Sequence, residues 1–173
     1  AAVTYDSIAP VVTLAQAATQ ADPTPNATIL FSVTLSEPLR DGTLTLDDLV
    51  VTNGSAALSC ADATTCTVTV TAAGEGAVSL APSAGFSVTD LAGNVTTTAG
   101  GADRQVTYDT IAPTLSLAQA ATQADPARLS PISFTLTTSE TLDASTVTAA
   151  DFSVTNGSVS TISCSGLACT ISI

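Results

Sequence analysis

The sequence predicts an all-β protein made of two successive antiparallel β-sandwiches, the second of them incomplete, and three observations lead to this class. Residues 3–10 return as residues 106–113 with a single Ser-to-Thr exchange, and the same offset persists downstream. Only 3% of the residues are aromatic, whereas the β-branched residues Thr and Val are abundant, which favours strands over helices. Short apolar/polar alternations separated by turn residues, without sustained helical periodicity, are typical of a β-sandwich.

The repeat sets the expected domain organisation, because its length suits one small domain per copy. We expect residues 1–8 to be a linker or the closing strand of an upstream copy, residues 9–109 to be a first complete repeat, and residues 110–173 to be a second, incomplete one. The absence of Met indicates that the chain comes from a longer precursor. The second copy stops before any counterpart of residues 78–108, so an apolar face and a bare sheet edge are expected there.

The first elements follow from alternation. Val12 and Leu14 share one face of an expected strand, and their counterparts Leu115 and Leu117 repeat it. Residues 16–20 are assigned to a turn because two prolines follow closely. Residues 29–35 form the clearest expected strand, with apolar side chains at every second position, and residues 132–136 repeat its pattern.

The remaining elements are shorter. Residues 41–48 are expected to hold one helical turn, and residues 49–51 form a strand whose counterparts Phe152 and Val154 should also point inward. Asn53-Gly54 predicts a turn. A further strand begins at residue 78, a loop spans residues 90–94, and Gly100-Gly101 predicts a bulge or bend before the last strand, which ends at Tyr108.

The four cysteines form two close pairs, Cys60/Cys66 and Cys164/Cys169, each flanking the turn of an expected hairpin. In a chain without His, such pairs indicate disulfides of an oxidising compartment, whereas a zinc site would need four converging ligands. Both members of each pair share parity with the apolar positions of their strands, so we expect bridges on the core side. Closing so short a loop contributes only about 2–2.5 kcal/mol to stability, so each bridge is expected mainly to fix the local register of its hairpin. The chain is therefore expected to be secreted or exposed at a cell surface.

Charge narrows the expected partners. Fifteen acidic residues stand against three Arg and no Lys or His, for a net charge of −12. Binding to nucleic acid or to an anionic membrane depends on neutralising phosphates, so neither is expected as a partner. No apolar run is long enough to span a bilayer, and no signal peptide is visible. The charge permits cations as ligands, and it also suffices to keep a Thr-rich surface soluble.

Four motifs together resemble the bacterial immunoglobulin-like (Ig-like) repeats of large surface proteins and adhesins. They are Tyr-Asp-Thr-Ile-Ala-Pro, Ser-Glu-Pro-Leu at residues 36–39, Asp-Leu-Val-Val-Thr-Asn-Gly at residues 48–54, and Val-Thr-Asp-Leu-Ala-Gly-Asn at residues 88–94. The resemblance covers nearly the whole chain and implies tandem Ig-like sandwiches acting as an extracellular stalk. Many members of that family carry calcium at or near the joints between repeats. The hairpin cysteines are not a general feature of the family.

This topology suggests a calcium site. The loop between the last two strands of an Ig-like repeat lies at the end where the chain enters, so Asp90 and Asn94 are expected near Asp6, with Glu37 and Asp41 on another loop of the same end. The corresponding candidates of the second repeat are Asp109, Glu140 and Asp143. Calcium takes six to eight oxygen ligands from such groups. The alternative is that these Asp and Asn side chains only cap their own turns.

All four asparagines, Asn26, Asn53, Asn94 and Asn156, stand in Asn-x-Ser/Thr triplets. These triplets permit glycosylation in a suitable host. Turn preference and the Thr-rich composition account for them equally well.

Enzymatic functions are disfavoured. Without His or Lys the chain has no Ser–His or Cys–His pair and no Lys base. The adjacent Asp47-Asp48 cannot form an opposed acid/base pair by themselves. Carbohydrate binding normally uses exposed aromatic side chains, and here Tyr5 and Tyr108 are more simply explained by packing.

The sequence therefore predicts a non-catalytic extracellular spacer whose partners are neighbouring Ig-like repeats of the same chain. The first alternative is a self-assembling subunit of an extracellular fibre, through lateral or end-to-end association or strand addition. The second is an accessory binding module of a secreted enzyme.

Overall fold

The structure is a computed structural model that describes residues 2–173. The chain divides into two compact units, Ala1–Thr110 and Ile111–Ile173. The repeat had suggested a boundary between residues 109 and 110, one residue earlier. Nearly all regular elements are strands, and the helical segments of the described residues are single 3-10 turns. The all-β class is thus confirmed.

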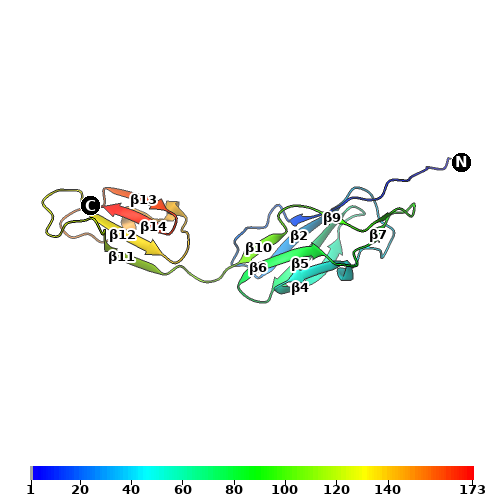
Figure 1. The fold of residues 1–173 in the computed structure, drawn as a ribbon, viewed down its shortest axis with the longest axis horizontal. Coiled ribbons are helices and arrows are strands. Elements are labelled where there is room, and N and C mark those ends of the chain that lie inside the picture. Colours follow the sequence, from blue (N-terminus) through cyan, green and yellow to red (C-terminus); the bar gives the residue numbers. More distant parts are fainter. Residues whose placement is uncertain (1) are drawn as a thin grey trace. The chain divides into compact units, whose positions relative to one another are not determined.

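The first unit contains two main sheets (Figure 1). The larger one has five strands in the spatial order β4 (Gly54–Cys60), β5 (Thr65–Ala72), β2 (Thr28–Leu35), β1 (Val12–Gln16) and β9 (Ala99–Gly100). The smaller one has three, in the order β10 (Gln105–Tyr108), β6 (Gly76–Pro82) and β3 (Leu49–Thr52). A short ribbon joins β7 (Val88–Thr89) to β8 (Val95–Thr96), and η1 (Leu46–Asp48) precedes β3.

These two sheets share one core, which makes the first unit a β-sandwich. Apolar side chains at alternate positions of β1, β2 and β5 are fully buried, and they form a single cluster with Leu49 of β3, Val78 and Leu80 of β6, and Val106 of β10. The period-two alternation in residues 29–35 therefore predicted both the strand and its buried face correctly.

The predicted turn at Asn53-Gly54 has a steric basis. Asn53 has φ 55°, in the left-handed region. A Cβ on Gly54 would lie 2.6 Å from Cγ1 of Val70 and 2.7 Å from the carbonyl oxygen of Thr71. Glycine is needed there because β4 approaches the backbone of β5 so closely.

The second unit repeats one sheet of the first. Its strands run in the order β11 (Leu115–Gln119), β12 (Ser133–Thr138), β14 (Ala168–Ser172) and β13 (Thr161–Ser165), as do β1, β2, β5 and β4 (Figure 1). The register also repeats, since Phe134 pairs with Ile171 as Phe31 pairs with Val68. Two 3-10 turns, η2 (Ala144–Thr146) and η3 (Ala149–Asp151), lie between β12 and β13.

One sequence expectation fails in the second unit. Phe152 and Val154 were expected on an inward-facing strand, but residues 152–155 form no strand and both side chains are only half-buried. Their counterpart β3 pairs with β6, and no described strand of the second unit takes the place of β6. Leu115 and Leu117 occupy the expected strand and remain more than half exposed, which agrees with the apolar face expected in a copy that stops before any counterpart of residues 78–108.

Both disulfides form as predicted, each between directly opposed residues of a hairpin. Only Cys66 and Cys169 lie in the core, whereas Cys60 is exposed and Cys164 is half-buried. The expectation that both members face the core is wrong for Cys60. β4 is an edge strand, and side chains at the edge of a sheet are covered by fewer neighbouring residues. No helix among the described residues is long and apolar enough to cross a membrane.

Candidate metal centre

Three carboxylates from distant parts of the first unit come together. Oxygens of Asp6, Glu37 and Asp90 all lie within 4.8 Å of one another. They come from the N-terminal segment, from the residues after β2, and from the loop after β7 respectively. The sequence-based expectation had placed these three residues at one end of the first repeat.

Asp90 is the centre of this cluster and is only 1% exposed. Its Oδ1 accepts hydrogen bonds from the backbone amides of Gly93 (2.7 Å) and Asn94 (2.8 Å), and its Oδ2 accepts one from Nδ2 of Asn94 (2.8 Å). Gly93 has φ 101°, a conformation that favours glycine and closes the loop around the carboxylate. The expectation that Asp90 caps its own turn is therefore met.

The segment after β2 is fixed to the same loop by backbone contacts. Leu39 and Asp90 form an isolated antiparallel bridge, and the amide of Arg40 donates to the carbonyl oxygen of Thr89 at 2.8 Å. This pairing holds residues 37–40 beside the β7–β8 ribbon and so brings Glu37 towards Asp90.

Asn94 connects the loop to the N-terminal segment. Its Nδ2 donates to Asp90 and also to the carbonyl oxygen of Asp6, at 3.4 Å. Asp6 in turn accepts a hydrogen bond from the amide of Ile8 at 3.0 Å. The sequence had suggested Asn94 as an oxygen ligand, but here its amide nitrogen faces the carboxylates, so it acts as a donor that organises them.

The electrostatics of the cluster favour a cation. Burial raises the pKa of Glu37, and the negative charges of Asp6 and Asp90 and a hydrogen bond with Asp6 raise it further. For Asp90, burial opposes ionisation, but the hydrogen bonds from Asn94, Gly93 and Ala92 outweigh it and lower the pKa. Asp90 therefore stays ionised beside a neighbour that resists ionisation, and a positive ion would relieve that repulsion.

The geometry fits calcium. Two oxygens that both bind Ca²⁺ at 2.3–2.6 Å lie at most about 5 Å apart, and the three carboxylates meet this limit. Carboxylates can each supply one or two oxygens, and water completes the usual six to eight.

The other suggested ligands lie elsewhere. Asp41 is exposed and lines a hollow beside the Cys60–Cys66 disulfide. Asp109 belongs to the first unit, where its amide donates to the carbonyl oxygen of Thr24 at 3.0 Å, whereas Glu140 belongs to the second. Asp143 caps η2: the hydroxyl and amide of Ser145 donate to it and lower its pKa.

The asparagines of the Asn-x-Ser/Thr triplets have structural roles that the triplets alone did not reveal. Nδ2 of Asn53 donates to the carbonyl oxygen of Gly74 at 2.7 Å, and Oδ1 of Asn26 accepts from the amide of Thr28 at 2.9 Å. Asn156, like Asn53, has a positive φ, here 60°. These contacts support the turn-based explanation of the triplets.

No protein family, curated protein or solved structure matches the chain. A functional proposal therefore has to be argued from the sequence repeat and from this geometry.

Proposed function

We propose that the chain is a non-catalytic extracellular spacer built from tandem Ig-like sandwiches, with calcium stiffening the entry to the first unit. The observation that carries this proposal is the repetition of a whole sheet, with the same strand order and pairing register, in two successive compact units. Units repeated in this way along one chain extend its reach without requiring a reactive centre.

The acidic cluster supplies the proposed joint. Residues 3–10 have the sequence of the segment that links the two units, residues 106–113, apart from one Ser-to-Thr exchange. Asp6 of this linker-like segment meets Glu37 and Asp90 of the unit that follows it. Calcium bound by these three groups clamps the incoming segment to the loops of the domain and limits its motion.

An extracellular location agrees with the two disulfides, which persist in oxidising compartments. It also agrees with calcium binding, because extracellular modules work at millimolar calcium, where weak sites are filled. The lack of His and Lys is in accord with a role without catalysis.

Thermal unfolding with added calcium tests the proposal. Millimolar Ca²⁺ is expected to raise the melting temperature of the first unit, because a ligand bound only by the folded state stabilises it. NMR relaxation of residues 3–8 is expected to show reduced motion at the same time. Asp6→Asn and Glu37→Gln should abolish both effects, whereas Asp41→Asn, an exposed acid outside the cluster, should retain them. An unchanged melting temperature with unchanged relaxation in the unaltered chain would rule out the clamp.

A further inference from the structure

An apolar sheet face lies open in the second unit. Leu115, Leu117 and Ile132 are 58%, 52% and 39% exposed. Their counterparts in the first unit, Val12, Leu14 and Ile29, are 1%, 0% and 0% exposed. The same sheet with the same register is therefore covered in one unit and uncovered in the other.

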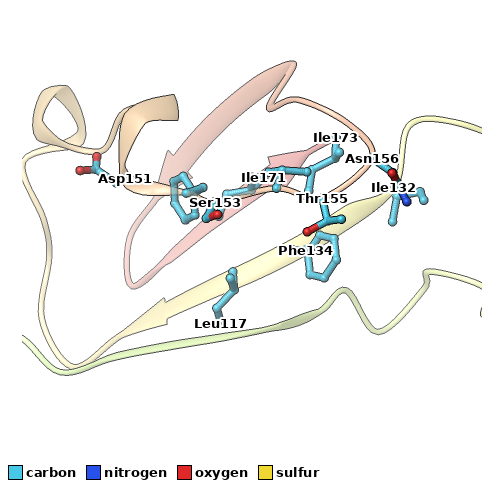
Figure 2. A pocket seen from close by; sticks show the side chains of 11 residues that line it. Leu117, Ile132, Phe134, Asp151, Ser153, Thr155, Asn156, Ile171 and Ile173 are labelled. Carbon is cyan, nitrogen blue, oxygen red and sulfur yellow. The ribbon is translucent and has the colours of Figure 1, made fainter.

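The uncovered face borders a pocket of about 500 Å³. Figure 2 shows its lining, with Leu117, Phe134 and Ile171 on the sheet and Ser153, Thr155 and Asn156 on the segment that crosses opposite. Phe152 and Val154 of that segment also line it. The counterparts of the sheet residues, Leu14, Phe31 and Val68, are fully buried in the core of the first unit.

The first unit shows which chemistry fills this space. Val78 and Leu80 of β6 and Val106 of β10 belong to the cluster that contains Leu14, Phe31 and Val68. They are 0%, 1% and 0% exposed, so they are enclosed in the same core as that sheet face. The occupant of the second unit's pocket should accordingly present Val and Leu at alternate positions of a strand.

Register specifies where that strand lies. In the first unit β6 pairs with β3 in an antiparallel arrangement, with Leu80 opposite Val51 and Ser79 opposite Thr52. Residues 152–155 are the counterpart of β3, and they form no strand. A strand with the pattern of β6 would pair with these residues, place its Leu opposite Val154, and direct its apolar side chains into the pocket.

We propose that this face is the docking site for an antiparallel strand pair with the pattern of β6 and β10, supplied by a repeat of the same kind. The inner strand completes a sheet with residues 152–155, and the outer strand pairs with the inner one. The inference depends on the internal repeat and on the exposed face. It does not depend on calcium or on the spacer role, so the two proposals can fail separately.

The N-terminal segment of a second copy is a poorer occupant, although its sequence matches β10. Val3 and Tyr5 are 95% and 88% exposed and thus free to associate. In the first unit, however, the strand order is β10-β6-β3, so a β10-like strand is separated from β3 by β6. Alone, it would not reach residues 152–155 or fill the pocket.

A labelled peptide of residues 76–108, titrated onto the intact oxidised chain, tests the proposal. We expect saturable binding, and hydrogen exchange should slow at residues 115–119 and 152–155. The Leu80→Asp peptide should bind more than about tenfold more weakly, because it would bury an unpaired charge. Leu117→Asp in the chain should weaken binding similarly, and it should leave the fold intact because this side chain is half exposed.

A second format guards against a peptide that does not stay soluble. A copy of residues 71–108 appended after Ile173 continues the repeat in phase and should protect the same residues. Protection in either format, sensitive to Leu80→Asp, supports the proposal. It is overturned if neither format protects residues 152–155, or if the Leu80→Asp peptide binds equally well. A dimer of the unmodified chain that protects these residues and is lost on deletion of residues 2–8 also overturns it, in favour of the N-terminal segment.

Discussion

Thr110 donates two hydrogen bonds to the carboxylate of Glu75, 35 residues earlier, one from its backbone amide to Oε2 (3.0 Å) and one from its hydroxyl to Oε1. Glu75 lies directly before β6, and Thr110 is the last residue of the first unit. The start of the linking segment is therefore held by the unit that precedes it. The corresponding N-terminal segment, residues 3–10, instead contacts the unit that follows it, through Asp6.

Glu75→Gln and Thr110→Val should each loosen this anchor. A hydrogen bond of this kind contributes about 0.5–1.5 kcal/mol, so amide exchange at Thr110 should accelerate roughly threefold to tenfold. Asp47→Asn, which alters an exposed acid within η1, is the matched control and should leave exchange at Thr110 unchanged. Equal exchange in all four proteins would show that the contact does not hold the segment.

When a chelator removes calcium, the acidic cluster should give the melting temperature of the first unit an unusual pH dependence. The raised pKa of Glu37 means that its contribution to stability is present below its ordinary value of 4.5 and is lost as pH rises through the raised value. The lowered pKa of Asp90 acts oppositely: its contribution is present above 3.8 and is lost as pH falls. The melting temperature of the first unit should therefore pass through a maximum in mildly acidic solution.

Glu37→Gln should remove the decline on the alkaline side of that maximum and preserve the decline on the acidic side. Calcium should have the same effect on the unaltered chain, since it offsets the repulsion among the three acids. The measurement is thermal unfolding between pH 3 and 8, followed for the first unit alone. An alkaline decline that persists in Glu37→Gln would assign it to another group.

Removal of the disulfides should affect the two units unequally. Each bridge closes a short loop and contributes about 2 kcal/mol in the chain-entropy model. The buried cluster of the second unit contains only Leu136, Cys169 and Ile171, far fewer side chains than that of the first. Cys164→Ser/Cys169→Ser should therefore unfold the second unit, whereas Cys60→Ser/Cys66→Ser should leave the first folded at a lower melting temperature. NMR spectra of the two double variants distinguish these outcomes.

Much of the fold could be predicted because its signals are local. Alternation at residues 29–35 identified β2, and paired cysteines identified both hairpins. Residues 152–155 show the limit of such signals, since they share the apolar pattern of β3 yet form no strand. Strand formation there requires a neighbour to accept and donate backbone hydrogen bonds, and a local pattern carries no information about that neighbour.

The acidic cluster, too, could be predicted only in part from the sequence. Topology placed Asp6, Glu37 and Asp90 at one end of the first unit, and the structure brings them together. Asp41 was expected with them because it lies on the same loop as Glu37, but it lines a different hollow. Loop membership does not determine the direction of a side chain. The contact between Glu75 and Thr110 had no local signal at all, because it joins turns that are far apart in sequence.

Equivalent leucines of the two units should tolerate truncation very differently. Leu14 is 0% exposed and Leu117 is 52% exposed, although they occupy the same position of the repeat. Leu14→Ala should cost about 2–5 kcal/mol because it leaves a cavity in a closed core. Leu117→Ala should cost less than about 1 kcal/mol, since water already reaches the side chain. Urea unfolding followed separately for each unit gives both values, and equal costs would show that the face of the second unit is covered in solution.

Gly101 is the glycine whose replacement should be least tolerated. It has φ 122°, and a Cβ there would lie 1.8 Å from the carbonyl oxygen of Leu14, in the middle of β1. Gly101→Ala must therefore displace the chain between β9 and β10 from β1, and it should destabilise the first unit by more than about 2 kcal/mol. Gly42→Ala is the matched control, because Gly42 has φ 74° and no atom lies within 4 Å of the added Cβ. It should cost only the strain of its backbone, about 1 kcal/mol. Similar losses for the two variants, measured by urea unfolding, would mean that the approach of Gly101 to β1 is looser in solution than in the structure.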